Sequence, residues 1–342
     1  MRKTLMSALV ASTLAFAGGA QAGLSFDLNG IGGGGVINVG AFDWAPTSFL
    51  ALGGQAAIRN FATGGAAAGN TFDILSHAKL TAYIDGNGNA QSLPGGFGEI
   101  TLVARYTETV TGILGNIATF SSTGAGWVEM YHSAVADSAN LTGANFDNGR
   151  LIMKAIGVSG QFGGSANGNF AVNNNPLVVL DGFGNNDYGP AQQTVSGSGS
   201  QDSLKFGTTS IALDNTYFLT ALSDFSILFS NISIGLPYGS VDPSDCFNPN
   251  MSVNAVGTIN AATQCQNNHL ANSAMSLQAA DGGVLPNIGA VNGLFGNTSP
   301  DFMAQTDYNS PVTGTVPEPG MLALLGLALA GLGLTTARRR RT

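Results

Sequence analysis

Alternating apolar and polar residues recur in short stretches through the central part of the chain. Residues 77–84 place Ala78, Leu80, Ala82 and Ile84 on one side, and residues 100–107 alternate in the same way. A period of two over five to eight residues predicts a strand with one buried and one solvent-facing side. On the same grounds we expect strands at 36–44, 110–120, 126–132, 151–158, 177–180, 203–213 and 216–234.

Glycine and asparagine separate these stretches, as in Gly32–Gly35 and Asn173–Asn175. Many short strands joined by such turns favour an all-β fold, an antiparallel β-sandwich or a jelly-roll-like domain. Apart from the two ends, no amphipathic helix longer than three turns is expected. Residues 255–280, rich in Ala, Asn and Gln, are the best candidate for helical structure.

The N-terminus has the pattern of a signal peptide. Arg2 and Lys3 precede an apolar run at 5–17, and Ala20-Gln21-Ala22 is the small-x-small pattern that signal peptidase cleaves. We therefore expect residues 1–22 to be removed in export, and Gly23 to begin the mature chain.

The C-terminus has three parts in a fixed order. A stiff break, Pro317-Glu318-Pro319-Gly320, is followed by residues 321–337 without a charged side chain and then by four arginines, Arg338, Arg339, Arg340 and Arg341. Seventeen helical residues span about 25 Å, the short end of what crosses a bilayer. The arginines would stay on the cytoplasmic side.

This ending resembles the PEP-CTERM sorting signal of Gram-negative bacteria through Pro317, Glu318 and Pro319, the apolar helix and the arginines. The resemblance implies a transient insertion in the inner membrane. It also implies that an exosortase cuts near the motif and that the protein goes to the cell surface or extracellular matrix. The alternative is an ordinary C-terminal membrane anchor.

Residues 26–30 (Phe-Asp-Leu-Asn-Gly) and 38–46 (Asn-Val-Gly-Ala-Phe-Asp-Trp-Ala-Pro) look like the opening of the flocculation-associated members of the PEP-CTERM group. That resemblance implies a role in holding cells together within exopolysaccharide.

Four segments follow from these signals: the signal peptide 1–22, a β-rich extracellular domain 23–296, a spacer 297–315 and the sorting signal 316–342. Within the domain, residues 239–296 are poor in strand patterns and contain Cys246 and Cys265. In an exported protein such a pair is first interpreted as a disulfide, which would pin this part of the chain as an excursion from the sheet. A thiol or metal site is the alternative.

The mature segment, residues 23–315, is strongly acidic. It contains six basic and 19 acidic side chains, a formal charge of −13. Such a surface repels phosphate backbones, so we expect no nucleic-acid partner.

One loop has the start of a calcium-binding pattern. Asp85, Asn87 and Asn89 offer oxygen ligands at alternate positions, but the later positions depart from the EF-hand. A hairpin turn is the alternative, because Asp-Gly and Asn-Gly are turn dipeptides. Weak Ca²⁺ binding is the one cofactor that the sequence suggests.

Catalytic patterns are sparse: there is no Gly-x-Ser-x-Gly and no His-Glu-x-x-His, and three histidines are scattered. We therefore assign no catalytic residue. Trp127, Glu129 and Tyr131 alternate along one expected strand, where they would form either a glycan contact or part of the core.

The sequence thus predicts a non-enzymatic surface or matrix protein that acts in exopolysaccharide-associated aggregation or flocculation. Its expected partners are signal peptidase, an exosortase and an exopolysaccharide or cell-surface glycan. The alternative is a secreted polysaccharide-modifying enzyme on a β-sandwich scaffold.

Overall fold

The computed structural model describes most of the region between the two expected export signals. The described residues are 23–32, 34–114, 117–139, 145–157, 164–169, 174–178, 192–195, 198–201, 204–206, 211–233, 251–260 and 302–314. The signal peptide, both cysteines and the sorting signal lie outside them.

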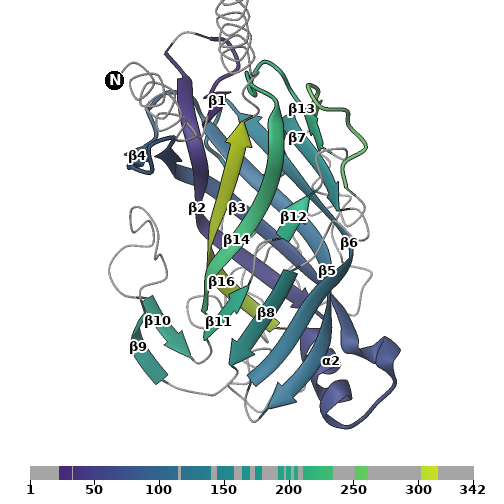
Figure 1. Ribbon diagram of the computed structural model, residues 1–342. Helices are drawn as coiled ribbons and strands as arrows, with labels where there is room; N and C mark the ends of the chain where they lie inside the picture. The colour runs from purple at the N-terminus through teal and green to yellow at the C-terminus, as the bar shows by residue number, and fades with distance from the viewer. Residues whose placement is uncertain are drawn as a thin grey trace, which may run out of the picture.

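Strands dominate the described chain (Figure 1). In the first half they are β1 (Leu24–Asp27), β2 (Val36–Leu52), β3 (Thr71–Asp85), β4 (Ala90–Ser92), β5 (Glu99–Leu114), β6 (Ile117–Ser133) and β7 (Gly149–Gly157). In the second half they are β8 (Gly164–Asn169), β9 (Asn174–Val178), β10 (Gln192–Val195), β11 (Ser198–Gln201), β12 (Leu204–Phe206), β13 (Ile211–Leu213), β14 (Leu222–Ser233), β15 (Ile259–Asn260) and β16 (Phe302–Gly314). A helix, α2 (Gly54–Ala62), and a 3₁₀ turn, η1 (Ala67–Asn70), connect β2 to β3.

Fourteen strands form one antiparallel sheet that curls on itself. Its main path runs β1-β2-β16-β14-β11-β8-β6-β5-β3-β4, and β2 also pairs with β3, so the path closes. The first half of β6 pairs with β8, whereas its second half pairs with β7, which also carries β13 and β15. The prediction of an all-β antiparallel fold is confirmed. Two walls of a single curled sheet face each other, as the two sheets of a sandwich do.

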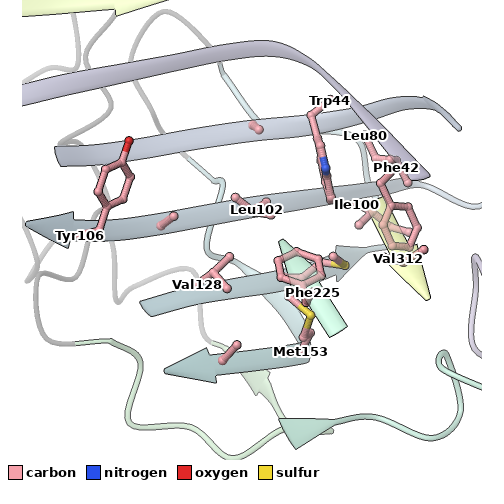
Figure 2. Packing of buried hydrophobic residues seen from close by; sticks show 14 of the residues in the cluster. Phe42, Trp44, Leu80, Ile100, Leu102, Tyr106, Val128, Met153, Phe225 and Val312 are labelled. Atoms are coloured by element: carbon pink, nitrogen blue, oxygen red, sulfur yellow. The ribbon is translucent and has the colours of Figure 1, made fainter. Parts of the chain in front are cut away.

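One core fills the space between the walls. The inward residues of β3 and β5 include Leu80 and Leu102, at alternate positions as the period of two predicts. Phe225 on β14 meets them across the interior, and Met153 on β7, which pairs with β6 in the same wall as β3 and β5, joins the same cluster (Figure 2). These side chains are at most 2% exposed. The curl of the sheet is therefore held by apolar burial from strands far apart in the sequence.

A second, smaller cluster lies on the outer face of the same strands. Its buried members are Leu50, Leu75, Val103, Tyr131, Phe146 and Leu151. Phe146, in the segment after β6, stacks on the His77 ring of β3 at 4.0 Å. The middle of β3 is consequently buried on both faces, which its sequence pattern does not show.

Helix α2 closes the end of the core opposite to β1 (Figure 1). It presents Ala57, which is 1% exposed, and the partly buried Ile58 and Phe61 to the core. Gly53, with φ of +84°, begins the helix from a left-handed conformation that favours glycine. The helix has nine residues, shorter than the three turns for which we searched the sequence.

Three expectations need correction. Residues 110–120, expected as one strand, are divided between β5 and β6, with Leu114 opposite Ile117. Residues 203–213 are divided between β12 and β13, and β14 begins only at Leu222. The expected spacer 297–315 is wrong for residues 302–314, because they form β16, a strand inside the sheet between β2 and β14.

Candidate functional site

The first and last described strands, β1 and β16, lie end to end along the same edge of β2. Strand β16 pairs with β2 up to Pro311, which lies opposite Ala41, and β1 pairs with the same edge of β2 from Leu24, opposite Val39. Only Gly40 of β2 thus lies between the end of one pairing and the start of the other, a step of about 7 Å along the strand. We call this strand position beside β2 the shared slot.

The other side of the shared slot is formed by residues 217–225. Gly314 lies opposite Leu222, and Val312 opposite Phe225. Around β1, the Leu219 amide donates to Ser25 O (2.9 Å) and the Asp27 amide donates to Tyr217 O (2.8 Å). Both terminal strands therefore have neighbours on both edges, and the chain must leave the sheet between them.

The sorting residues Pro317, Glu318, Pro319 and Gly320 and the arginines Arg338–Arg341 lie outside the described residues. Their distance along the chain still constrains them. Pro317 follows Gly314 by three residues, so their Cα atoms are at most about 11 Å apart. The expected signal cleavage site at Ala20 and Ala22 is equally close to β1, which begins one residue after Gly23.

A half-buried polar cluster lies beside the shared slot. His132 Nε2 is 2.6 Å from Phe97 O, which can only accept, so this nitrogen carries the proton and Nδ1 accepts from the Tyr217 hydroxyl at 2.8 Å. Arg150 bonds Asp214 Oδ2 at 2.6 Å and lies over the Tyr217 ring. The cluster joins β6, β7 and the segment before β14. Sequence reasoning missed it, because its members are scattered over more than 80 positions.

Burial and the neighbouring Arg150 charge lower the pKa of His132, although the bond to Phe97 O and the Asp27 carboxylate oppose this. At Asp214, burial raises the pKa, but the bonds from Arg150 and Thr216 outweigh it and leave the pKa below its ordinary value. His132 is thus neutral and Asp214 charged near neutral pH. The groups are used in mutual contacts that hold this end of the sheet.

The predicted glycan contact at Trp127, Glu129 and Tyr131 needs correction. Glu129 is 1% exposed and Tyr131 is fully buried, with its hydroxyl bonded to Glu129 Oε2 at 2.5 Å. Trp127 is partly buried against the outer cluster. These side chains do share one face, as predicted, but the segment around Ser252 covers it, so Glu129 and Tyr131 cannot stack on or bond a surface sugar.

Glu129 instead fixes that covering segment. Its carboxylate accepts the Ser252 amide (3.1 Å) and pairs with Lys154 Nζ (3.1 Å), which also donates to Ser252 O (2.6 Å) and Asn254 O (3.0 Å). Burial and the adjacent Glu129 raise the pKa of the Tyr131 hydroxyl well above its ordinary value, so it remains a donor.

Glu99, on the neighbouring strand β5, likewise fixes a covering segment, the one that contains Asp137 and Ser138. It pairs with Lys79 at 2.7 Å and accepts the amides of Asp137 and Ser138 at 2.9 Å each. Burial raises its pKa, but the bonds from Lys79, Ser138 and Asp137 outweigh that effect and lower the pKa overall. Two buried glutamates thus hold two covering segments against the outer face.

The loop at Asp85, Asn87 and Asn89 is the turn between β3 and β4. The Asp85 carboxylate accepts the amides of Asn87 (2.8 Å) and Asn89 (3.0 Å), and the Asn89 and Gln91 side-chain amides point to it as well. The backbone bond from Asn89 is the main cause that lowers the Asp85 pKa. Of the two alternatives, the geometry favours the turn. Ca²⁺ binding here stays a prediction. In the part of the chain that the structure describes, no three His, Cys, Asp or Glu side chains are grouped to hold a metal ion.

Four basic side chains of the body are used in ion pairs within it. Within the described residues, ion pairs join Lys79 to Glu99, Arg105 to Asp73, Arg150 to Asp214 and Lys154 to Glu129. The mature segment has six basic residues against 19 acidic ones, so few basic side chains are left to offset its negative charge.

Comparison with known families gives one match. Residues 315–341 match the family model described as the PEP-CTERM protein-sorting motif. The chain carries a PEP-CTERM sorting signal. The resemblance stated from Pro317–Pro319, the apolar run and the arginines is confirmed. The signal marks an exported protein of a Gram-negative bacterium that an exosortase sorts towards the surface.

This PEP-CTERM match covers the tail and does not reach the body. No curated protein and no solved structure matches the chain. The finer resemblance of residues 26–46 to flocculation-associated members has no support from these comparisons. Among the described residues no helix is long and apolar enough to span a membrane, and the expected span at 321–337 lies outside them. The Cys246–Cys265 disulfide also lies outside them and stays a prediction.

Proposed function

We propose that this protein is a non-enzymatic component of the cell surface or extracellular matrix, and that it acts in exopolysaccharide-associated aggregation. The observation that carries the proposal is the sorting signal, joined to an acidic β-rich body. Export and sorting determine where the protein is located, and the body contributes the contacts to the matrix.

The use of the carboxylates supports a binding role over catalysis. The three glutamates of the mature segment, Glu99, Glu108 and Glu129, are at most 4% exposed. Glu99 and Glu129 are held by lysines and backbone amides, as a structural role requires. General acid–base work on a polysaccharide would need carboxylates that reach the substrate.

The charge of the body indicates what kind of glycan it would contact. Because Lys79, Arg105, Arg150 and Lys154 are engaged in ion pairs, the body offers mainly hydroxyl, amide and carboxylate groups to a ligand. Such groups suit a neutral glycan directly. They suit an acidic glycan through a bridging divalent cation.

The proposal is tested in the source bacterium. We expect a strain that lacks the protein to flocculate less, and expression of the full chain to restore flocs. A chain without Val316–Thr342 should be exported yet fail to restore them, because it is not sorted. Undiminished flocculation in the deletion strain would contradict the proposal.

A second experiment separates binding from catalysis. The purified exported protein is incubated with the strain's own exopolysaccharide, with and without EDTA, and both retained protein and released reducing ends are measured. We expect retention without release. Release of reducing ends would favour a polysaccharide-modifying enzyme instead.

A further inference from the structure

Strand β16 connects the body directly to the sorting signal. The match to the sorting motif begins at residue 315, and β16 ends at Gly314. Residues 312–314 are paired with β14 in an antiparallel ladder. The chain upstream of Pro317 is therefore part of the sheet in the folded protein.

Strand β1 also keeps β16 from extending further along β2. A terminal strand could extend its pairing into open space, but β1 fills the position ahead of β16 along β2, from Val39 onwards. The segment around Leu219 covers the other edge of β1. The sorting motif is thus attached within three residues of a point that is closed on both sides.

Peptide-cleaving enzymes act on extended segments whose backbone is free, and cleavage of a folded chain follows the population of its locally opened form. An enzyme that binds the chain as an extended segment on the N-terminal side of Pro317 reaches residues of β16, which ends three positions before Pro317. Those residues include Val312, which is 6% exposed, and its neighbours in the ladder.

We propose that the exosortase engages this protein with β16 outside the sheet, and that insertion of β16 into the shared slot ends the chain's susceptibility to sorting cleavage. Release from the membrane and completion of the sheet are then ordered steps. A chain that inserts β16 too early stays anchored.

The seated strand is held by specific contacts. Ser310 is fully buried and accepts a hydrogen bond of 3.0 Å from Trp44 Nε1 of β2. Val312 joins the main core beside Phe225 of β14 (Figure 2). These contacts determine how small a fraction of the folded protein has β16 outside the sheet.

The test separates folded precursor from newly made precursor. The full chain is accumulated in cells with the exosortase gene switched off. The exosortase is then switched on while new synthesis is blocked, and loss of the C-terminal helix is followed by mass spectrometry. We expect accumulated wild-type precursor to be cut at least about ten times more slowly than chains made with the exosortase present, because cleavage follows the opened population.

Two variants test the cause of this resistance. Twelve Gly and Ser residues inserted between Gly314 and Thr315 add a reach of about 19 Å. They should let the exosortase cut accumulated precursor as fast as new chains. The same insertion between Gly95 and Gly96, in an exposed loop, should leave the precursor resistant. Val312→Asp, which places a carboxylate in the core, should also restore cleavage by unseating β16.

Cleavage of accumulated wild-type precursor at the rate of new chains would overturn the proposal. So would an insertion variant at Gly314 that resists as strongly as the wild type, since resistance would then not come from the short connection. The insertion follows the last residue of β16 and changes no core residue, so this comparison holds even if Val312→Asp fails to fold.

Discussion

The indole nitrogen of Trp44 donates a hydrogen bond of 3.0 Å to the hydroxyl of Ser310, 266 positions later in the chain. Both residues are fully buried. The bond joins β2, near the start of the body, to β16, its last described strand. It therefore reports whether the sheet has been completed, and its loss should loosen the strand next to the sorting signal.

Ser310→Ala should destabilise the purified exported protein by about 1–3 kcal/mol, because it leaves the Trp44 N–H without an acceptor in the core. Urea unfolding followed by tryptophan fluorescence measures this change. Ser92→Ala, at an exposed position of β4, is the matched control and should change stability little. Equal stability of the two variants would show that the Trp44 bond is not needed.

Lys154→Met tests the ionic contact that holds the Ser252 segment. The substitution leaves the buried Glu129 carboxylate without its cation, and removing one partner of a buried pair typically costs about 3–5 kcal/mol. The double variant Lys154→Met, Glu129→Gln should regain part of the loss because no uncompensated charge is left. Hydrogen exchange at the amides of 251–258 should rise in the single variant. Unchanged exchange there would contradict the role that we assign to Glu129.

Glu108→Gln tests a carboxyl group that is buried inside the curled sheet. Burial raises the pKa of Glu108 to about 8, against a weaker opposite effect from Ser122. Between about pH 4.5 and pH 8 the folded protein keeps a proton that the unfolded chain loses, so the free energy of unfolding falls as the pH rises. The Gln variant lacks this loss. It should exceed the wild type in stability by more than about 1 kcal/mol at pH 8, and the difference should shrink towards pH 5. Parallel stability curves for the two proteins would rule this out.

The period-two pattern predicted the main strands because their inward residues are continuously apolar. Residues 77–84 and 100–107 both lie in long strands whose alternate side chains reach the core. The pattern failed where the outward face of a strand is buried as well as its inward face. Tyr131 and Leu75 are outward residues of their strands, yet the covering segments bury them. Their pattern cannot be told from that of exposed aromatic and aliphatic residues, and this made the Trp127–Tyr131 face look like a surface.

Strand β16 was not predicted because its sequence, with Asn309, Ser310 and Pro311 in a row, is typical of a linker. Its place in the sheet comes from partners more than 70 positions away, on β14 and β2. No local pattern contains that information. The sorting signal, in contrast, is recognised by its own order of residues and needs no tertiary partner, so the sequence alone was sufficient to find it.

His132 provides the final test, at the polar cluster beside the shared slot. Burial and Arg150 lower its pKa below the ordinary 6.5. In the folded protein the ring therefore resists a proton that the unfolded chain accepts. The free energy of unfolding should then fall as the pH drops through about 6.5, and the loss should level off below the folded pKa.

An NMR titration should place the His132 transition below pH 6.5. His132→Phe should lose this component of the pH dependence, although at pH 8 it should be less stable than the wild type for want of the bonds to Phe97 O and Tyr217. A His132 that titrates above 6.5 would contradict this prediction, because protonation would then stabilise this end of the sheet.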